Sequence, residues 1–123
     1  MRGGLTAFIP MILLAATAAS AAPACRESPR LTGACFDVRG RLALGNGDPA
    51  WRIWPMGTHR MLGVVDGQLS PESLESGGLP PTVARATARS TLPNHAVWGT
   101  FTVCPLSPDR PGHMRSVCIA DLK

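Results

Sequence analysis

The 123-residue chain lacks most of the patterns by which enzymes and metalloproteins are recognised. It has no Gly-x-Ser-x-Gly elbow for a nucleophile, and its acidic residues are scattered instead of paired. The glycines of segment 45–47 are too few for a phosphate loop, and His59, His95 and His113 each stand alone beside turn residues. We therefore assign no catalytic residue, no metal site and no cofactor, and we expect the protein not to be an enzyme.

Tyrosine is absent too, and only six residues are aromatic, three Trp and three Phe. A chain of this length with so few large side chains buries one modest core. The sequence shows no internal repeat and no low-complexity tract, and it has no apolar run after residue 21 that is long enough to span a bilayer. These absences indicate one small domain.

An apolar run does open the chain. Arg2 precedes it, residues 5–19 make up its mostly apolar length, and small residues at 19–21 end it. This layout is typical of a secretory signal peptide, and the run is shorter than the roughly 20 residues that a membrane-spanning helix needs. We expect residues 1–21 to be a cleaved signal peptide and the mature protein to be periplasmic or secreted.

The cysteines follow this leader, and their even number in a small exported chain indicates structural disulfides. They are Cys25, Cys35, Cys104 and Cys118, and no pair has the two-residue gap of a zinc or redox motif. Cys25 could instead carry a lipid, but Ala22 stands where a lipobox has Leu.

Four cysteines allow three pairings. If strands 97–104 and 114–120 fold back on each other, Cys104 lies opposite Cys118, which favours that bond and leaves Cys25 to Cys35. The alternative is a Cys35–Cys104 bond joining two sheets, as in immunoglobulin-type sandwiches.

Short strands separated by Gly/Pro turns dominate the pattern. Apolar residues favour strands over 36–44, 51–54, 60–65, 97–104 and 114–120. We expect an all-β fold, a small disulfide-stapled β-sandwich of immunoglobulin or transthyretin type or a barrel with one short helical turn. After an irregular lead-in at 22–33, residues 34–123 form a single β-rich domain. A short helix is expected at 70–72, and segment 82–92 fits helix or strand.

Side-chain parity predicts the core and one candidate surface. The expected core residues are Phe36, Val38, Leu42, Ile53, Phe101 and Val103. On strand 51–54, Trp51 and Trp54 face opposite ways, so that one packs in the core and the other is partly exposed. Trp54 with Arg52 and Arg60 forms a possible ligand patch for sugars or peptides, through stacking and cation–π contacts. The alternative is that both tryptophans only pack in the core and at its edge.

The charge balance is mildly basic. Without Arg2 the chain carries 11 basic and 8 acidic residues, and every basic residue except Lys123 is an arginine. A solvated basic surface is the simpler interpretation, and attraction to an anionic envelope polymer is the other.

Several segments resemble a set of small uncharacterised exported proteins of Gram-negative bacteria. They are CFDVRGRL at 35–42, NGDP at 46–49, RIWP at 52–55, GTHR at 57–60, LGV at 62–64 and VWGTFTVCP at 97–105. The resemblance covers about half of the mature chain and brings no catalytic residues. Segments 38–42, 47–49 and 52–54 are also loosely similar to transthyretin-like and carboxypeptidase-regulatory-like sandwiches.

Together these observations predict an exported, non-enzymatic domain of the periplasm or cell envelope that acts by binding or structural interaction. The expected partner is an envelope protein or an anionic envelope polymer, not nucleic acid. A small secreted hydrolase or a hydrolase inhibitor is the alternative.

Overall fold

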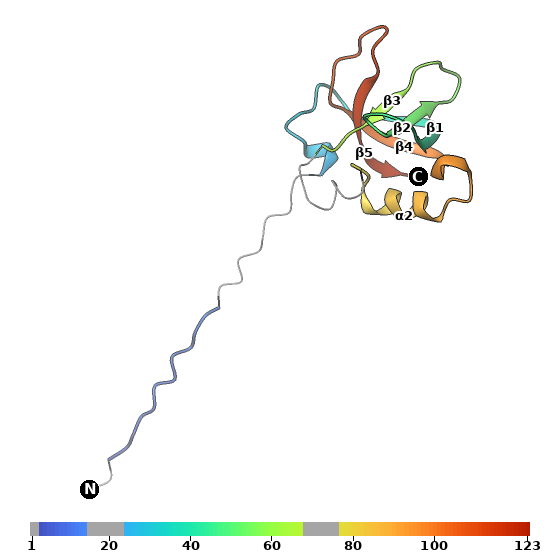
Figure 1. Cartoon of the computed structure of the whole chain (residues 1–123). Helices are drawn as coiled ribbons and strands as arrows, with labels where there is room; N and C mark the ends of the chain where they lie inside the picture. The colour runs from blue at the N-terminus through green and yellow to red at the C-terminus, as the bar shows by residue number, and fades with distance from the viewer. Residues whose placement is uncertain (1–2, 15–23, 68–76) are drawn as a thin grey trace.

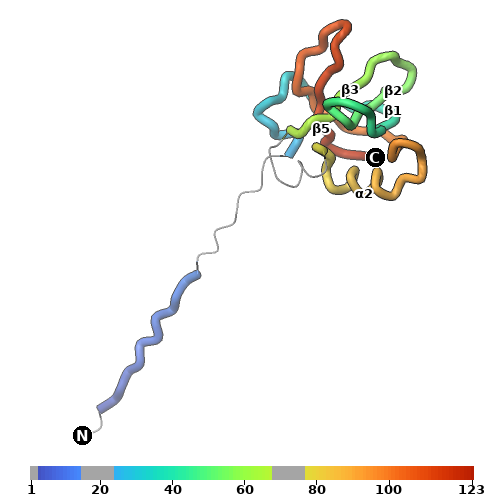
Figure 2. Tube along the Cα trace, in the orientation of Figure 1, coloured from blue at the N-terminus to red at the C-terminus, as the bar shows by residue number. Residues whose placement is uncertain are grey.

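A computed structural model describes residues 3–14, 24–67 and 77–123 (Figures 1 and 2). Residues 3–14 contain no helix or strand, and their apolar side chains are almost wholly exposed, Leu5 to 98% and Phe8 to 94%. The predicted end of the leader at 19–21 and the predicted helix at 70–72 lie outside the described residues. No helix of the described ranges is long and apolar enough to cross a membrane.

Within these residues, five strands close into one barrel in the order β1-β2-β3-β5-β4. Their bounds are β1 Phe36–Leu44, β2 Trp51–Pro55, β3 Leu62–Val64, β4 Val97–Pro105 and β5 Arg115–Leu122. The expected hairpins β1–β2 and β4–β5 are antiparallel, whereas β3 and β5 pair in parallel. The barrel alternative is therefore confirmed. A sandwich is not what forms, because β1 pairs with both β2 and β4 and the sheet closes on itself.

The closure depends on Gly40 in the middle of β1. Gly40 is the register partner of Pro55 on one side and of Gly99 on the other. A Cβ at Gly40 would overlap the backbone carbonyl of Trp54 and approach Cα of Pro55 to 3.0 Å. Glycine therefore lets β1 coil tightly between its two neighbours.

The ambiguous segment forms helix α2 (Pro81–Arg89), which is longer than the single helical turn expected. Pro81 occupies the first turn, where its missing N–H costs no hydrogen bond. Val83 and Thr87 are buried on one side of the helix, four residues apart. With Leu79, Val83 joins the barrel core. Figure 1 shows α2 at one end of the barrel, and the β2–β3 turn and β4–β5 loop at the other.

The predicted core is correct at its centre and wrong at one end. Leu42, Ile53, Phe101 and Val103 are fully buried. Phe36 and Val38 are only half-buried and pack at the margin of that core. The difference arises because they line the end of the barrel that α2 does not cover.

The cysteine pairing expected first is wrong. Cys104 and Cys118 are register partners as predicted, but the disulfides are Cys25–Cys118 and Cys35–Cys104. Cys35 directly precedes β1 and lies beside Cys104, with a Cα–Cα distance of 4.1 Å. The alternative pairing of Cys35 is thus confirmed, although it joins neighbouring strands of one sheet.

The second disulfide, Cys25–Cys118, forms because the lead-in packs against β5. The lead-in forms the 3-10 turn η1 (Cys25–Glu27), and the Ser28 hydroxyl donates to the carbonyl of Gly67 at 2.9 Å. These contacts bring Cys25 onto Cys118, where both are buried in a small cluster with Cys104. The sulfur of Cys25 is therefore not available for a lipid.

The strand order and the helix between β3 and β4 give the topology of the OB-fold, a five-stranded Greek-key barrel. Such a fold supports many functions, so that function has to be argued from the surfaces of this chain.

Candidate ligand-binding surfaces

Three neighbouring strands carry a row of large side chains on the outside of the barrel. Arg41 of β1 is the register partner of Trp54 in β2 and also of Trp98 in β4. Because directly opposite residues of a sheet point to the same face, Arg41 stands between the two indoles. Even residues of β2 and β4 face outward here, since Ile53 and Phe101 fill the core.

The row is open to solvent and hollowed. The exposed fraction is 43% for Trp54, 59% for Trp98 and 57% for the nearby Met56. With Arg41 and the turn residues 55–58, these side chains line a shallow cavity of about 460 Å³. We call this surface the tryptophan cleft, defined by Arg41, Trp54, Met56 and Trp98. Two of the three tryptophans of the protein thus lie on its outside.

The geometry of Trp54 is fixed by its neighbours. Its indole Nε1–H donates to the carbonyl of Thr58 at 2.8 Å, and the Arg41 guanidinium carbon lies 5.7 Å from its ring centre. This distance is within the range of a cation–π contact. The orientation of the Trp54 indole is therefore fixed. The Trp98 indole makes no hydrogen bond with any of the described residues.

Two arginines of β1 carry positive charge at or near the cleft. Within the described residues, neither Arg39 nor Arg41 has a carboxylate partner. Asp37, farther along β1, is occupied by the Lys123 amine at 2.9 Å and by the Thr102 hydroxyl at 2.6 Å. These two hydrogen bonds, that of Thr102 first, hold the pKa of Asp37 below its usual value. Asp37 is thus a paired carboxylate and does not neutralise the two arginines.

The structure places the three residues of the predicted ligand patch apart: Trp54 lines the cleft, whereas Arg52 and Arg60 do not. The Arg52 guanidinium donates to the carbonyls of Pro49 and Asn46, at 3.1 Å each, and so holds the β1–β2 turn. Arg60 lies beyond the β2–β3 turn and pairs with Asp109. Trp51 packs against the core, as expected for one of the two tryptophans.

Sequence reasoning missed Arg41 and Trp98. The signal was present, because both have the outward parity of their strands. The register that places them beside Trp54 depends on β1 pairing with two strands, which the local pattern does not reveal.

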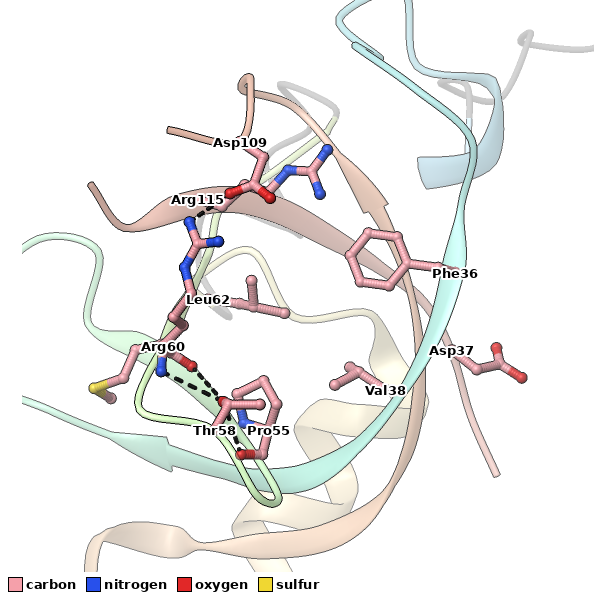
Figure 3. A pocket seen from close by; sticks show the side chains of 10 residues that line it. Phe36, Asp37, Val38, Pro55, Thr58, Arg60, Leu62, Asp109 and Arg115 are labelled. Atoms are coloured by element: carbon pink, nitrogen blue, oxygen red, sulfur yellow. Dashed lines mark hydrogen bonds and ion pairs between the residues drawn. The ribbon is translucent and has the colours of Figure 1, made fainter. Parts of the chain in front are cut away.

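A second hollow lies at the end of the barrel opposite α2 (Figure 3). We call it the barrel mouth. Its volume is about 250 Å³, and its apolar walls include Phe36, Val38 and Leu62. Figure 3 shows Asp109 between the guanidinium groups of Arg60 and Arg115, and Asp37 pointing away from the hollow.

The charged groups at the mouth leave one positive charge in excess. Asp109 pairs with Arg60, whose hydrogen bond keeps the pKa of Asp109 below its usual value. The Arg115 guanidinium lies 5.5 Å from the centre of the Phe36 ring, and its Nε–H donates to the carbonyl of Ser107 at 3.2 Å. Within the described residues its two terminal nitrogens donate no hydrogen bond.

The described residues bring one group of metal-ligating atoms together, the sulfurs of Cys25, Cys104 and Cys118, which lie within 4.8 Å of one another. All three are bonded in disulfides, so that they hold no thiolate for a metal. Within the described ranges, His59, His95 and His113 form no hydrogen bond with a serine or a carboxylate.

Comparisons with protein-family models, curated proteins and solved structures find no match for this chain. The fold and its surfaces thus define a class only, a small disulfide-bonded β-barrel with an exposed aromatic cleft and a hollow at one end.

Proposed function

We propose that the protein is an exported, non-enzymatic binding domain of the periplasm or cell envelope, and that a partner protein docks on the tryptophan cleft. The observation that carries this proposal is the row Trp54–Arg41–Trp98, which is exposed although the chain has only six aromatic residues. Tryptophan, arginine and methionine are the residue types enriched at the centres of protein interfaces.

The arginine charges at the cleft indicate which kind of partner surface is complementary to it. Arg39 and Arg41 have no carboxylate partner in the described part of the chain, and Arg41 lies over the indole of Trp54. The complementary surface is an apolar patch that carries an acidic side chain opposite Arg41. Met56 adds an unbranched side chain that adapts to the shape of such a patch.

Export is supported by two observations. Both disulfides are of the kind that persists in oxidising compartments. Residues 3–14 expose nearly all of their apolar side chains, which is unfavourable for a segment that stays on a folded domain in water.

Mass spectrometry of the protein from the cell envelope tests export. We expect an N-terminus at Ala22 or within a few residues of it, and no lipid. A diacylglyceryl group on Cys25 would contradict both the processing and the disulfide of that residue.

Docking is tested by a photoreactive benzoylphenylalanine at Met56, in cells that produce the protein. The matched control places it at Met114, which is exposed to 39% but does not line the cleft. We expect a discrete protein adduct from position 56, lost with Trp98→Ala and absent from position 114. Equal adducts from both positions, or none from either, would contradict docking on the cleft.

Two further outcomes distinguish docking of a partner protein from the other proposed functions, with Trp98→Ala and Arg39→Gln as the variants. An adduct with a hydrolase whose activity falls when the protein is added would identify the protein as a hydrolase inhibitor, which is one kind of protein-binding domain. Retention on isolated anionic envelope polymer that Arg39→Gln weakens and Trp98→Ala does not would instead favour a polymer ligand and contradict protein docking.

A further inference from the structure

The barrel mouth carries an inference beyond the docking of a partner on the cleft, because its walls and rim have different chemistry. Phe36, Val38 and Leu62 offer carbon surface inside the hollow, and Arg60 and Arg115 stand at its rim. A hollow of about 250 Å³ is smaller than the roughly 300–1,000 Å³ of common ligand pockets. It therefore suits one compact group.

Arg115 is the group that is prepared for an anion. Its Nε–H is occupied by the Ser107 carbonyl, and its plane lies near the Phe36 ring, so that its orientation is fixed from two sides. Its two terminal nitrogens remain without a hydrogen bond in the described residues. A guanidinium held in this way presents two parallel N–H groups, which is the geometry that binds a carboxylate in a bidentate manner.

The second arginine does not compete for the same anion. Arg60 donates to the carboxylate of Asp109 and to the carbonyl of Arg110 at 3.3 Å. Asp109 lies between the two guanidinium groups, hydrogen-bonded to Arg60 and attracted through space by Arg115. The three groups together carry one net positive charge, which matches a ligand with a single negative charge.

We propose that the barrel mouth binds a small organic carboxylate with a compact, branched apolar group. The carboxylate lies on the terminal nitrogens of Arg115, and the apolar group enters the hollow against Phe36, Val38 and Leu62. This chemistry has two sources, a free short-chain acid and the C-terminal residue of a polypeptide that ends in leucine or a similar residue.

The test titrates the processed, oxidised protein purified from the cell envelope, and two-dimensional NMR of its backbone amides follows the binding. The probes are 4-methylpentanoate for the free acid and N-acetyl-leucine for the chain end, each paired with its uncharged amide. We expect both acids to shift the resonances of Phe36, Leu62 and Arg115. The amides should bind about tenfold or more weakly, because they lack the charge-assisted bond to arginine.

Arg115→Gln should weaken the acids by about the same factor and leave the amides unchanged. Arg89→Gln removes an exposed arginine in the last turn of α2, at the other end of the barrel, and is the matched control, with no change in acid binding. Tighter binding of N-acetyl-leucine assigns the site to a chain end, and equal or tighter binding of 4-methylpentanoate assigns it to a free acid.

Three results would overturn the proposal: no shift at the mouth at millimolar acid, equal binding of acid and amide, or no effect of Arg115→Gln. The comparison of acid with amide uses the unchanged protein, so that it decides even if Arg115→Gln does not fold. Because Trp98→Ala should leave acid binding intact, failure at the mouth and failure of docking on the cleft are independent results.

Discussion

Phe101 and Trp98 lie three residues apart on β4 and face opposite sides of the barrel wall. Phe101 is fully buried in the core, whereas Trp98 is exposed to 59%. Replacement of Phe101 by Ala should reduce the free energy of unfolding by about 3–5 kcal/mol, since it removes a buried ring and leaves a cavity. Trp98→Ala should change it by no more than about 0.5 kcal/mol. Urea denaturation of both variants measures the contrast.

A loss below about 1 kcal/mol for Phe101→Ala would place this strand at an edge or reverse its faces. A loss above about 2 kcal/mol for Trp98→Ala would mean that the cleft is a packing feature of the fold, and not a surface kept free for a partner.

A single residue, Asp37, makes the stability of the protein depend on pH. In the folded protein the Thr102 hydroxyl and the Lys123 amine hold the pKa of Asp37 below its ordinary value. A lowered pKa in the folded state adds stability above the unfolded pKa, which is near 4, and that stability is lost as pH falls through the folded pKa. Wild type should therefore exceed Asp37→Asn in thermal midpoint at pH 6, and the difference should shrink towards pH 2.

Asp121→Asn is the control for the removal of one carboxylate, because its side chain keeps an oxygen to accept the N–H of Leu122. A constant difference between wild type and Asp37→Asn from pH 6 to pH 2 would show that ionisation of Asp37 adds no stability through its bonds to Thr102 and Lys123.

Residue parity predicts which side of a strand a side chain occupies, and little more. It places Trp54 outside and Ile53 inside, as the structure does. It does not predict the partners of Arg52 and Arg60, because long arginine side chains reach the carbonyls of turns and a carboxylate 49 residues away. It does not predict the place of Arg41 between two tryptophans either, because that place depends on the pairing of β1 with both β2 and β4.

At the scale of elements, strands were predictable and the helix was not. Period-two alternation marks β1 and β4 because one face of each meets the core. The segment of α2 mixes alanines with threonines, and its local preference does not decide between helix and strand. Burial of Val83 against the end of the barrel favours the helix, and this contact depends on the closed sheet.

Gly40 gives a prediction at this scale. A methyl group there would overlap the backbone of β2, which cannot move without opening the pairing of β1. Gly40→Ala should therefore destabilise the barrel by about 1–3 kcal/mol or more. Gly45→Ala is the matched control, since its nearest neighbour would be 3.6 Å from the added Cβ. Thermal denaturation compares the two, and equal midpoints would contradict the tight coil at Gly40.

At the scale of the whole molecule, the sequence pattern predicts neither the closure of the barrel nor the pairing of the cysteines. Local alternation does not say that β3 pairs in parallel with β5, a contact between segments more than 50 residues apart. Nor does it say that the lead-in packs on β5, although this contact decides which cysteines bond. Sequence spacing put Cys104 opposite Cys118 correctly, but each of them is bonded to another cysteine, Cys104 to Cys35 and Cys118 to Cys25.

The disulfides tie the N-terminal lead-in, β1, β4 and β5 into one unit. Non-reducing peptide mapping should show Cys25 with Cys118 and Cys35 with Cys104. When one bond is present, the other closes a loop of only about 25 residues, through the lead-in and the β4–β5 hairpin, and so contributes about 3.5 kcal/mol by loss of unfolded-chain entropy.

Replacement of either cysteine pair by Ala should therefore lower the free energy of unfolding by a similar amount, measured by urea denaturation. Replacement of all four should cost about 8 kcal/mol, because the remaining bond then opens a loop of the order of 100 residues, and a domain of this size should no longer fold stably. A peptide that joins Cys104 to Cys118 would contradict the packing of the lead-in on β5. A four-Ala variant as stable as either pair variant would show instead that the barrel core holds the fold without its cross-links.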